Sequence, residues 1–296
     1  MSKNATEARH ENAEGLDALE APAVLRLLAQ GQQAAARAVD DAIPAIAEGA
    51  ELAANTLRNG GRLIYAGAGS SGLMAMADAL ELPGTYGISH DRIAVLLAGG
   101  ISSLTDMAGA PEDDIAQAAQ DGEVITASDC VICVSASGST PYVLAIAALA
   151  KSRRAKVIAI ANNAGAPLFD GADAAILLAT PPEVIAGSTR MGAGTAQKIT
   201  FNMLSTLTAI KLGHVHDGHM VDMNADNEKL RNRATRMVAD IAGIDLEEAG
   251  RRVESAAGSV KVAVLLAAGA RNADAAKAAL TRSGQVLRQA LAEFER

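Results

Sequence analysis

The chain has 296 residues, of which 50% are hydrophobic and only 2% aromatic, and it carries 26 basic against 34 acidic residues. This length allows a large buried core, with one main domain and a smaller appendage as the expected organisation. The net charge of −8 and the shortage of stacking side chains argue against nucleic acid as the main partner. Residues 1–17 carry no apolar signal segment, and no apolar run approaches the ~20 residues of a membrane span, so we expect a cytoplasmic protein that does not enter a membrane.

Helices and then short strands are predicted along the first two thirds of the chain. Residues 22–57 are alanine-rich, with Gly31 and Pro44 as breaks, which predicts two helices. Five short apolar runs follow, and most are separated by helix-length segments. Continuous rather than alternating apolarity predicts a parallel sheet that is covered on both faces. The runs are residues 63–66, 93–97, 130–134, 157–161 and 174–178.

The last third of the chain is predicted to be helical. Ser188 and Thr189 are candidate caps of a long helix that reaches to about residue 212. From residue 245 onward the pattern is one of short amphipathic helices without a strand, which indicates a small subdomain. The fold class expected is therefore α/β. Its parts are an N-terminal helical segment over 1–57, a main domain with a parallel five-stranded sheet over 58–233, and a helical C-terminal subdomain over 234–296.

The turn after the first predicted strand suits an anion. A G-x-G-x-x-G pattern that begins at Gly67 leads into a helical stretch, and the free N–H groups and the dipole of a helix start attract negative charge. The pattern also matches a dinucleotide fingerprint, but residues 97–100 at the end of the next strand lack the acid that would hold a ribose. The hydroxyls of Ser70 and Ser71 favour a compact phosphate, so we expect a phosphorylated metabolite rather than NAD.

A second turn repeats this chemistry after the third predicted strand, at residues 135–140. Ligands of open parallel sheets bind beyond the carboxyl ends of the strands, where both turns are expected to lie. Two hydroxyl-rich turns at one edge strengthen the phosphate prediction. The residues of the two turns that are expected to bind substrate are Gly69, Ser70, Ser71, Ser135, Ser137, Ser139 and Thr140.

The two strands and their turns, Gly-Ala-Gly-Ser-Ser-Gly and Ser-x-Ser-Gly-x-Thr, resemble the sugar isomerase (SIS) domain. Further motifs resemble the N-acetylmuramic acid 6-phosphate etherases and the related glucokinase regulatory proteins over nearly the whole chain. The resemblance implies an SIS-type three-layer sandwich, a homodimer, a phosphorylated amino sugar as substrate, and no metal or redox cofactor. The motifs are Thr6-Glu-x-Arg9, Asp78-Ala-x-Glu81-x-Pro83, Gly187-Ser-Thr-Arg190, Ala193-Gly-Thr-Ala-Gln-Lys198, Met220-Val-Asp222 and Gly258-Ser-Val-Lys261.

The activity implied by the resemblance is cleavage of the D-lactyl ether at C3 of a sugar 6-phosphate. Removal of the C2 proton and protonation of the departing lactate call for carboxyl groups with separated pKa values. The glutamates of the family match Glu81, as the main acid/base, and Glu112, as the second catalytic carboxylate. The other residues expected to contact the substrate are Glu183, Ser188, Thr189 and Arg190.

Two features leave parts of this interpretation open. A straight helix from Ser71 would carry Glu81 roughly 15 Å from the phosphate turn. Either that helix ends early, or a second copy of the chain supplies the carboxylate. In addition, Leu73, Ser139 and Gly192 stand where the family usually has arginine or lysine, so the exact sugar is left open.

Other functions are weighed beside the etherase. An aldose–ketose isomerase would share the C2 proton abstraction but keep the C3 substituent, and a sugar-phosphate-binding regulator would bind without turnover. The related glucokinase regulatory proteins have chains of about twice this length. The shorter length of this chain therefore favours the enzyme. His214, His216 and His219 near Asp222 form the one cluster that suggests a metal, but the family has no metal there and we expect none.

Overall fold

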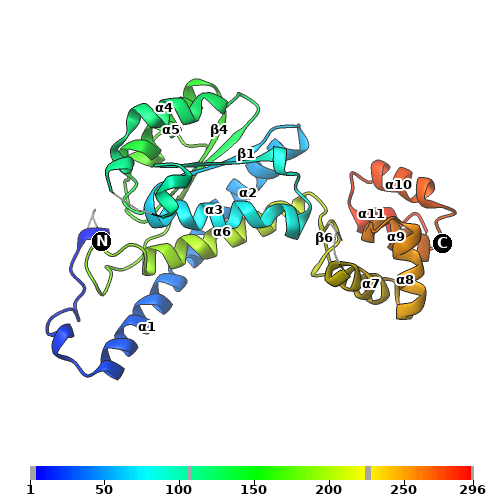
Figure 1. Cartoon of the computed structure of the whole chain (residues 1–296), viewed down its shortest axis with the longest axis horizontal. Coiled ribbons are helices and arrows are strands. Elements are labelled where there is room, and N and C mark those ends of the chain that lie inside the picture. Colours follow the sequence, from blue (N-terminus) through cyan, green and yellow to red (C-terminus); the bar gives the residue numbers. More distant parts are fainter. Residues whose placement is uncertain (1–4, 106–108, 224–227, 295–296) are drawn as a thin grey trace. The chain divides into compact units, whose positions relative to one another are not determined.

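The computed structural model describes residues 5–105, 109–223 and 228–294, and its centre is one parallel sheet (Figure 1). The strand order is β2-β1-β3-β4-β5, and all neighbours run parallel. Every strand lies within one residue of a predicted apolar run, so the predicted α/β class with a five-stranded parallel sheet is confirmed. The strands are β1 (Leu63–Gly67), β2 (Ile93–Leu97), β3 (Cys130–Val134), β4 (Lys156–Ala161) and β5 (Ala174–Leu177).

The strand order reverses between β1 and β3. From β1 the chain crosses to β2 on one side and then returns to β3 on the other side of β1. Ligand crevices of open parallel sheets form outside the carboxyl ends of the strands at such a reversal. Gly67, the last residue of β1, is in register with Val134, the last residue of β3. The two hydroxyl-rich turns therefore leave the sheet at the same level.

Helices cover both faces of the sheet, as the continuous apolarity of the strands predicts (Figure 1). One face carries α4 (Ile115–Asp121) and α5 (Pro141–Ser152). The other carries α2 (Ile43–Arg58), α3 (Gly69–Tyr86) and α6 (Gly192–Lys211). On this face, Tyr65 of β1 packs its ring against Phe201 of α6, with 5.9 Å between the ring centroids. The two helices predicted over residues 22–57 are present as α1 (Ala21–Arg37) and α2, and Pro44 lies at the start of α2, but the break expected at Gly31 is wrong because α1 continues through it.

The chain divides into two compact units. Unit 1 comprises residues 1–80 and 91–205, and unit 2 comprises residues 81–90 and 206–296. The helical N-terminal segment thus belongs to the same unit as the sheet, and the domain limits expected at residues 57 and 233 stay a prediction. Among the described residues, no helix combines the length and the apolar character needed to cross a bilayer.

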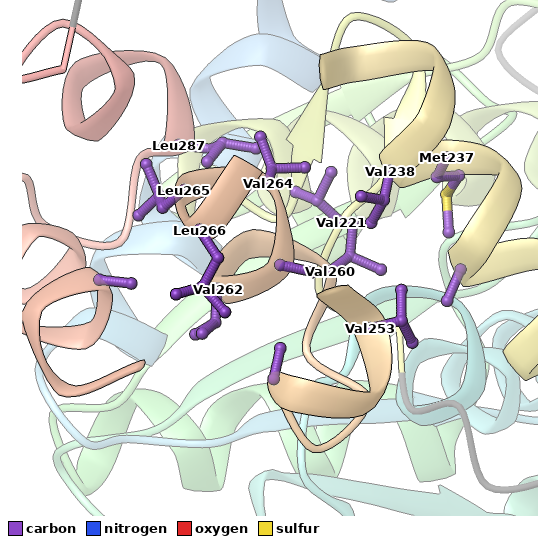
Figure 2. Packing of buried hydrophobic residues seen from close by; sticks show 14 of the residues in the cluster. Val221, Met237, Val238, Val253, Val260, Val262, Val264, Leu265, Leu266 and Leu287 are labelled. Carbon is purple, nitrogen blue, oxygen red and sulfur yellow. The ribbon is translucent and has the colours of Figure 1, made fainter. Parts of the chain in front are cut away.

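Besides the last residues of α3 and α6, unit 2 contains a short hairpin followed by helices. The hairpin pairs β6 (Val215–His216) with β7 (His219–Met220). The hydrophobic core of unit 2 is almost entirely aliphatic, with Val253, Val260 and Leu287 among the buried side chains (Figure 2). The described tail is helical, as predicted. The helices are α7 (Glu228–Ala242), α8 (Leu246–Ser255), α9 (Val260–Ala267), α10 (Ala273–Arg282) and α11 (Leu287–Leu291).

The histidines of residues 214–219 take part in contacts within unit 2. His214 Nδ1 lies 2.6 Å from the carbonyl oxygen of Tyr86, and His214 Nε2 lies 3.0 Å from Asp222 Oδ2. The same Asp222 oxygen accepts a hydrogen bond of 3.0 Å from Lys261 Nζ, whose residue is 2% exposed. Burial lowers the pKa of His214. In the described part of the chain, no group of three or more His, Cys, Asp or Glu side chains is arranged to hold a metal ion.

Candidate active site

A cavity of about 200 Å³ lies beyond the carboxyl ends of β1 and β3, within unit 1. Its wall is rich in hydroxyl groups, and the residues that sequence reasoning selected supply most of them. Their roles in binding and catalysis stay predictions. The predicted residues that line the cavity are Ser70, Ser71, Glu112, Ser135, Ser137, Thr140 and Thr189.

Hydrogen bonds hold the hydroxyls of the second turn in place. Ser135 Oγ lies 2.7 Å from Thr140 Oγ1 and 3.3 Å from Ser137 Oγ. It also accepts a hydrogen bond of 3.0 Å from the N–H of Gly138, which has a φ of +70°. A Cβ on Gly138 would come within 2.3 Å of Ala166 Cβ, so only glycine fits this turn without rearrangement. The three hydroxyls therefore form a preorganised set at one side of the cavity.

The start of α3 supplies backbone donors to the same cavity. Gly72 N–H makes the first intrahelical bond, to the carbonyl of Ala68 at 2.9 Å. The N–H groups that precede it in the first turn have no acceptor within the helix, and the helix dipole adds positive potential there. Ser70 and Ser71 of this turn line the cavity. Hydroxyls and helix N–H groups together are a suitable set of donors for a phosphate.

Glu112 places a carboxyl group at the α3 side of the cavity. A Cβ on Gly69, which has a φ of +52°, would lie 2.6 Å from Glu112 Oε1, so glycine permits this close approach. Burial, with a smaller contribution from the charge of Asp113, raises the pKa of Glu112 above the usual 4.5. Leu73 and Leu97 wall a small space of about 20 Å³ beside Glu112, which explains part of that desolvation.

Several predicted site residues lie off the cavity wall. Gly69 lines the small space beside Glu112 and is not among the residues that line the cavity. Ser139 is exposed, and its hydroxyl donates to Ser137 Oγ at 3.0 Å. Ser188 is half-buried and Arg190 is exposed, and neither lines the cavity. The contacts of these residues with substrate stay predictions.

Glu183 caps helix α6. It is 7% exposed, and its two carboxylate oxygens accept hydrogen bonds from the N–H groups of Gly192 and Ala193, at 2.9 Å and 2.8 Å. The expectation that Ser188 or Thr189 caps this helix is therefore wrong, because the carboxylate takes the N–H groups at the helix start. A negative side chain at this end also interacts favourably with the helix dipole. In this geometry Glu183 supports the loop of Thr189 and does not line the cavity.

Replacing Glu183 with Ala is expected to lower the free energy of unfolding by about 2–4 kcal/mol, because two charge-assisted hydrogen bonds to buried N–H groups are lost. Urea titration of the purified variant measures this. Glu123→Ala, at an exposed glutamate, is the control and should leave the unfolding midpoint unchanged. A Glu183→Ala variant with unchanged stability but a raised KM would instead support the predicted sugar contact.

Helix α3 continues past Glu81 and ends at Tyr86, with Pro83 inside it. Of the two possibilities raised by the sequence, an early helix end is therefore wrong. Glu81 is exposed and follows Ser71 by ten residues, or roughly 15 Å along the helix axis. It is not among the residues that line the cavity of unit 1.

Sequence reasoning missed two residues with polar side chains that line the cavity, Thr6 and Glu7. Both belong to a motif that resembles the family, but a polar segment near residue 6 gives no local sign of where it packs. Among the described residues that line this cavity, none is a lysine or arginine. The positive potential in this cavity therefore comes from hydroxyl and backbone N–H dipoles, and its negative charge comes from the carboxyl groups of Glu7 and Glu112.

Comparison with known proteins places this chain in a family. The SIS domain model matches residues 85–212, in agreement with the SIS-type fold expected. An N-acetylmuramic acid 6-phosphate etherase from Geobacillus thermodenitrificans is 39% identical, over 97% of this chain and 98% of the relative. One from Symbiobacterium thermophilum is 42% identical, over 90% of this chain and 89% of the relative. A solved phosphoheptose isomerase from Francisella tularensis is 21% identical with a TM-score of 0.47, over 65% of this chain and 98% of that one, which is too distant to bear on the activity. The chain belongs to the family of N-acetylmuramic acid 6-phosphate etherases.

Proposed function

We propose that this chain cleaves the D-lactyl ether of N-acetylmuramic acid 6-phosphate and releases N-acetylglucosamine 6-phosphate and D-lactate, as a carbon–oxygen lyase. Relatives that carry this enzyme name match nearly its whole length. The structural observation that carries the proposal is the Glu112 carboxyl, with its raised pKa, facing two hydroxyl-rich turns in one cavity. Such a group can move a proton while the turns hold a phosphate.

The phosphate is proposed to sit between the turns that follow β1 and β3. Ser71, Ser135 and Thr140 offer hydroxyl donors there, and the first turn of α3 offers N–H groups. Backbone N–H groups at a helix start can bind an anion without a cationic side chain. Leu73, Ser139 and Gly192 stand where the family usually has a cationic side chain. The hydroxyl and backbone N–H groups therefore bind the phosphate in this chain.

The chemistry needs one base and one acid. Opening of the sugar ring exposes the C1 aldehyde, which acidifies the proton on C2. Glu112, as a carboxylate, takes that proton, and its raised pKa makes it a stronger base. The C3–O bond then breaks, and its electron pair leaves on the lactate oxygen, which is protonated by an acid. Water finally adds its hydroxyl to C3, and C2 regains a proton.

Glu81 is proposed as the acid that protonates the departing lactate and later handles the incoming water. Because α3 continues as a helix past Glu81, we infer that a second copy of the chain in a homodimer supplies this carboxyl group. We also place the reaction in the cytoplasm, since the charged phosphate keeps such sugars inside the cell. Size measurement of the purified protein in solution tests the dimer.

Incubation with N-acetylmuramic acid 6-phosphate in H₂¹⁸O is expected to release D-lactate, with the label in the C3 hydroxyl of the sugar product and none in lactate. A coupled D-lactate dehydrogenase assay and mass spectrometry measure the two products. Ketose formation without lactate would favour an isomerase, and binding without turnover would favour a regulator. Either result would overturn the proposal.

A further inference from the structure

The N-terminal segment is fixed to the end of β4 beside the cavity. Thr6, within the short 3-10 helix η1 (Ala5–Glu7), is 5% exposed. Its N–H donates to Asn163 Oδ1 at 3.2 Å, and its hydroxyl accepts from Asn163 Nδ2 at 2.9 Å. Asn163 Nδ2 also lies 3.4 Å from the carbonyl oxygen of Ser137, in the second hydroxyl-rich turn. One buried side chain therefore ties residue 6 to the wall of the cavity.

This attachment places Glu7 on the cavity wall. Glu7 lines the cavity together with Glu112, so two carboxyl groups face one space of about 200 Å³. A Cβ on Gly187 would lie 3.5 Å from Glu7 Oε2, which shows that the carboxylate rests near the loop before Thr189. Among the described residues, no donor or cation pairs with the Glu7 side chain.

A carboxylate in this cavity that has no partner among the described residues is unsuited to the phosphate and suited to the rest of the sugar. It repels an anion, and it only accepts hydrogen bonds when ionised. The hydroxyl groups and the acetamido N–H of an N-acetylated sugar are donors. A hydrogen bond from such a donor to a carboxylate is charge-assisted and stronger than a neutral one.

We propose that Glu7 is a specificity-determining residue that accepts hydrogen bonds from the hydroxyl or acetamido donors of the bound sugar. The hydroxyls of the two turns hold the phosphate, and Glu7 selects for the sugar that is attached to it. This inference rests on the proposed function for the identity of the sugar. It assigns the N-terminal segment to the substrate site.

Calorimetric titration of the full chain with N-acetylglucosamine 6-phosphate and, separately, with inorganic phosphate tests the assignment. Glu7→Gln is expected to weaken binding of the sugar phosphate by about 10- to 100-fold, since a charge-assisted acceptor is lost. Inorganic phosphate should bind equally well or more tightly, because a repelling charge is removed. Glu11→Gln, at an exposed glutamate four residues further on, is the matched control and should bind both ligands as the parent does.

Three outcomes would overturn the inference. If Glu7→Gln binds both ligands like the parent, Glu7 does not touch the sugar. If both affinities fall by the same factor, the residue supports the structure of the site instead. If the parent chain binds phosphate but no sugar phosphate, the proposed function fails and this inference falls with it. A parent chain that binds the sugar phosphate but releases no D-lactate would leave the Glu7 test intact and count against the etherase alone.

Discussion

Glu112→Gln is expected to reduce D-lactate release by about 10²- to 10⁴-fold while N-acetylglucosamine 6-phosphate still binds. Glutamine has nearly the same shape as glutamate but cannot take the C2 proton. Glu112 lines the cavity, whereas the phosphate is proposed to be held by hydroxyl and N–H groups elsewhere on its wall. Turnover and binding should therefore separate in this variant. Steady-state assays and calorimetry measure the two quantities, and wild-type turnover in the variant would remove Glu112 from the mechanism.

The pH dependence gives a second readout of the same variant. The base form of Glu112 is the active one, so activity should rise as the pH rises through its pKa and fall below it. Because burial and Asp113 raise that pKa, the acid limb of kcat/KM should lie above pH 4.5. Glu112→Gln should lack this limb. Asp113→Asn, at an exposed neighbour, is the control: it should keep activity and move the limb to lower pH, because a repelling charge is gone.

Asp78→Ala is expected to lower the free energy of unfolding by about 3–5 kcal/mol, because it removes the charged acceptor of three hydrogen bonds from buried or half-buried groups. Asp78 is 7% exposed. Its carboxyl group accepts hydrogen bonds from Tyr65 Oη at 3.1 Å, Asn202 Nδ2 at 3.1 Å and Ser205 Oγ at 2.9 Å. These bonds join β1, α3 and α6. Urea titration followed by circular dichroism measures the loss.

Two further variants make the Asp78 prediction specific. Asp78→Asn keeps one carbonyl acceptor and should cost less than Asp78→Ala. Asp41→Ala removes an exposed aspartate and should leave the unfolding midpoint unchanged. Burial and the contact with Asp78 raise the pKa of Tyr65 well above 10, so its hydroxyl remains a donor over the whole range of a titration near neutral pH. Equal stability of Asp78→Ala and Asp41→Ala would contradict the network as a source of stability.

The sheet could be predicted from the sequence because its physical signal is local. A parallel strand buried on both faces must be apolar at successive positions, and the apolar runs at residues 93–97 and 130–134 have the same bounds as strands β2 and β3. The hydroxyl-rich turns could be predicted for the same reason, since each follows its strand directly. Parallel pairing then brings the two turns together without any further signal.

The remaining parts of the site depend on contacts that the local sequence does not encode. Glu183 lies nine positions before Gly192, at the start of α6, and only the path of the irregular loop between them turns its carboxylate toward Gly192. Glu7 reaches the cavity because Thr6 meets Asn163, which is 157 positions away. Neither pairing leaves a periodic pattern. The position of Glu81 could be judged only once the length of α3 was known.

The bond between Thr6 and Asn163 also has a consequence for biosynthesis. Residue 6 leaves the ribosome 157 positions before its partner, and at 5–20 residues per second this interval is roughly 8–30 s. During that time the N-terminal segment has no docking surface, because the end of β4 does not yet exist. The N-terminal segment, and with it Glu7, can therefore dock on the cavity wall only after β4 and Asn163 have been synthesised. A ribosome-bound chain that stops short of β4 should hold residues 5–7 open to protease.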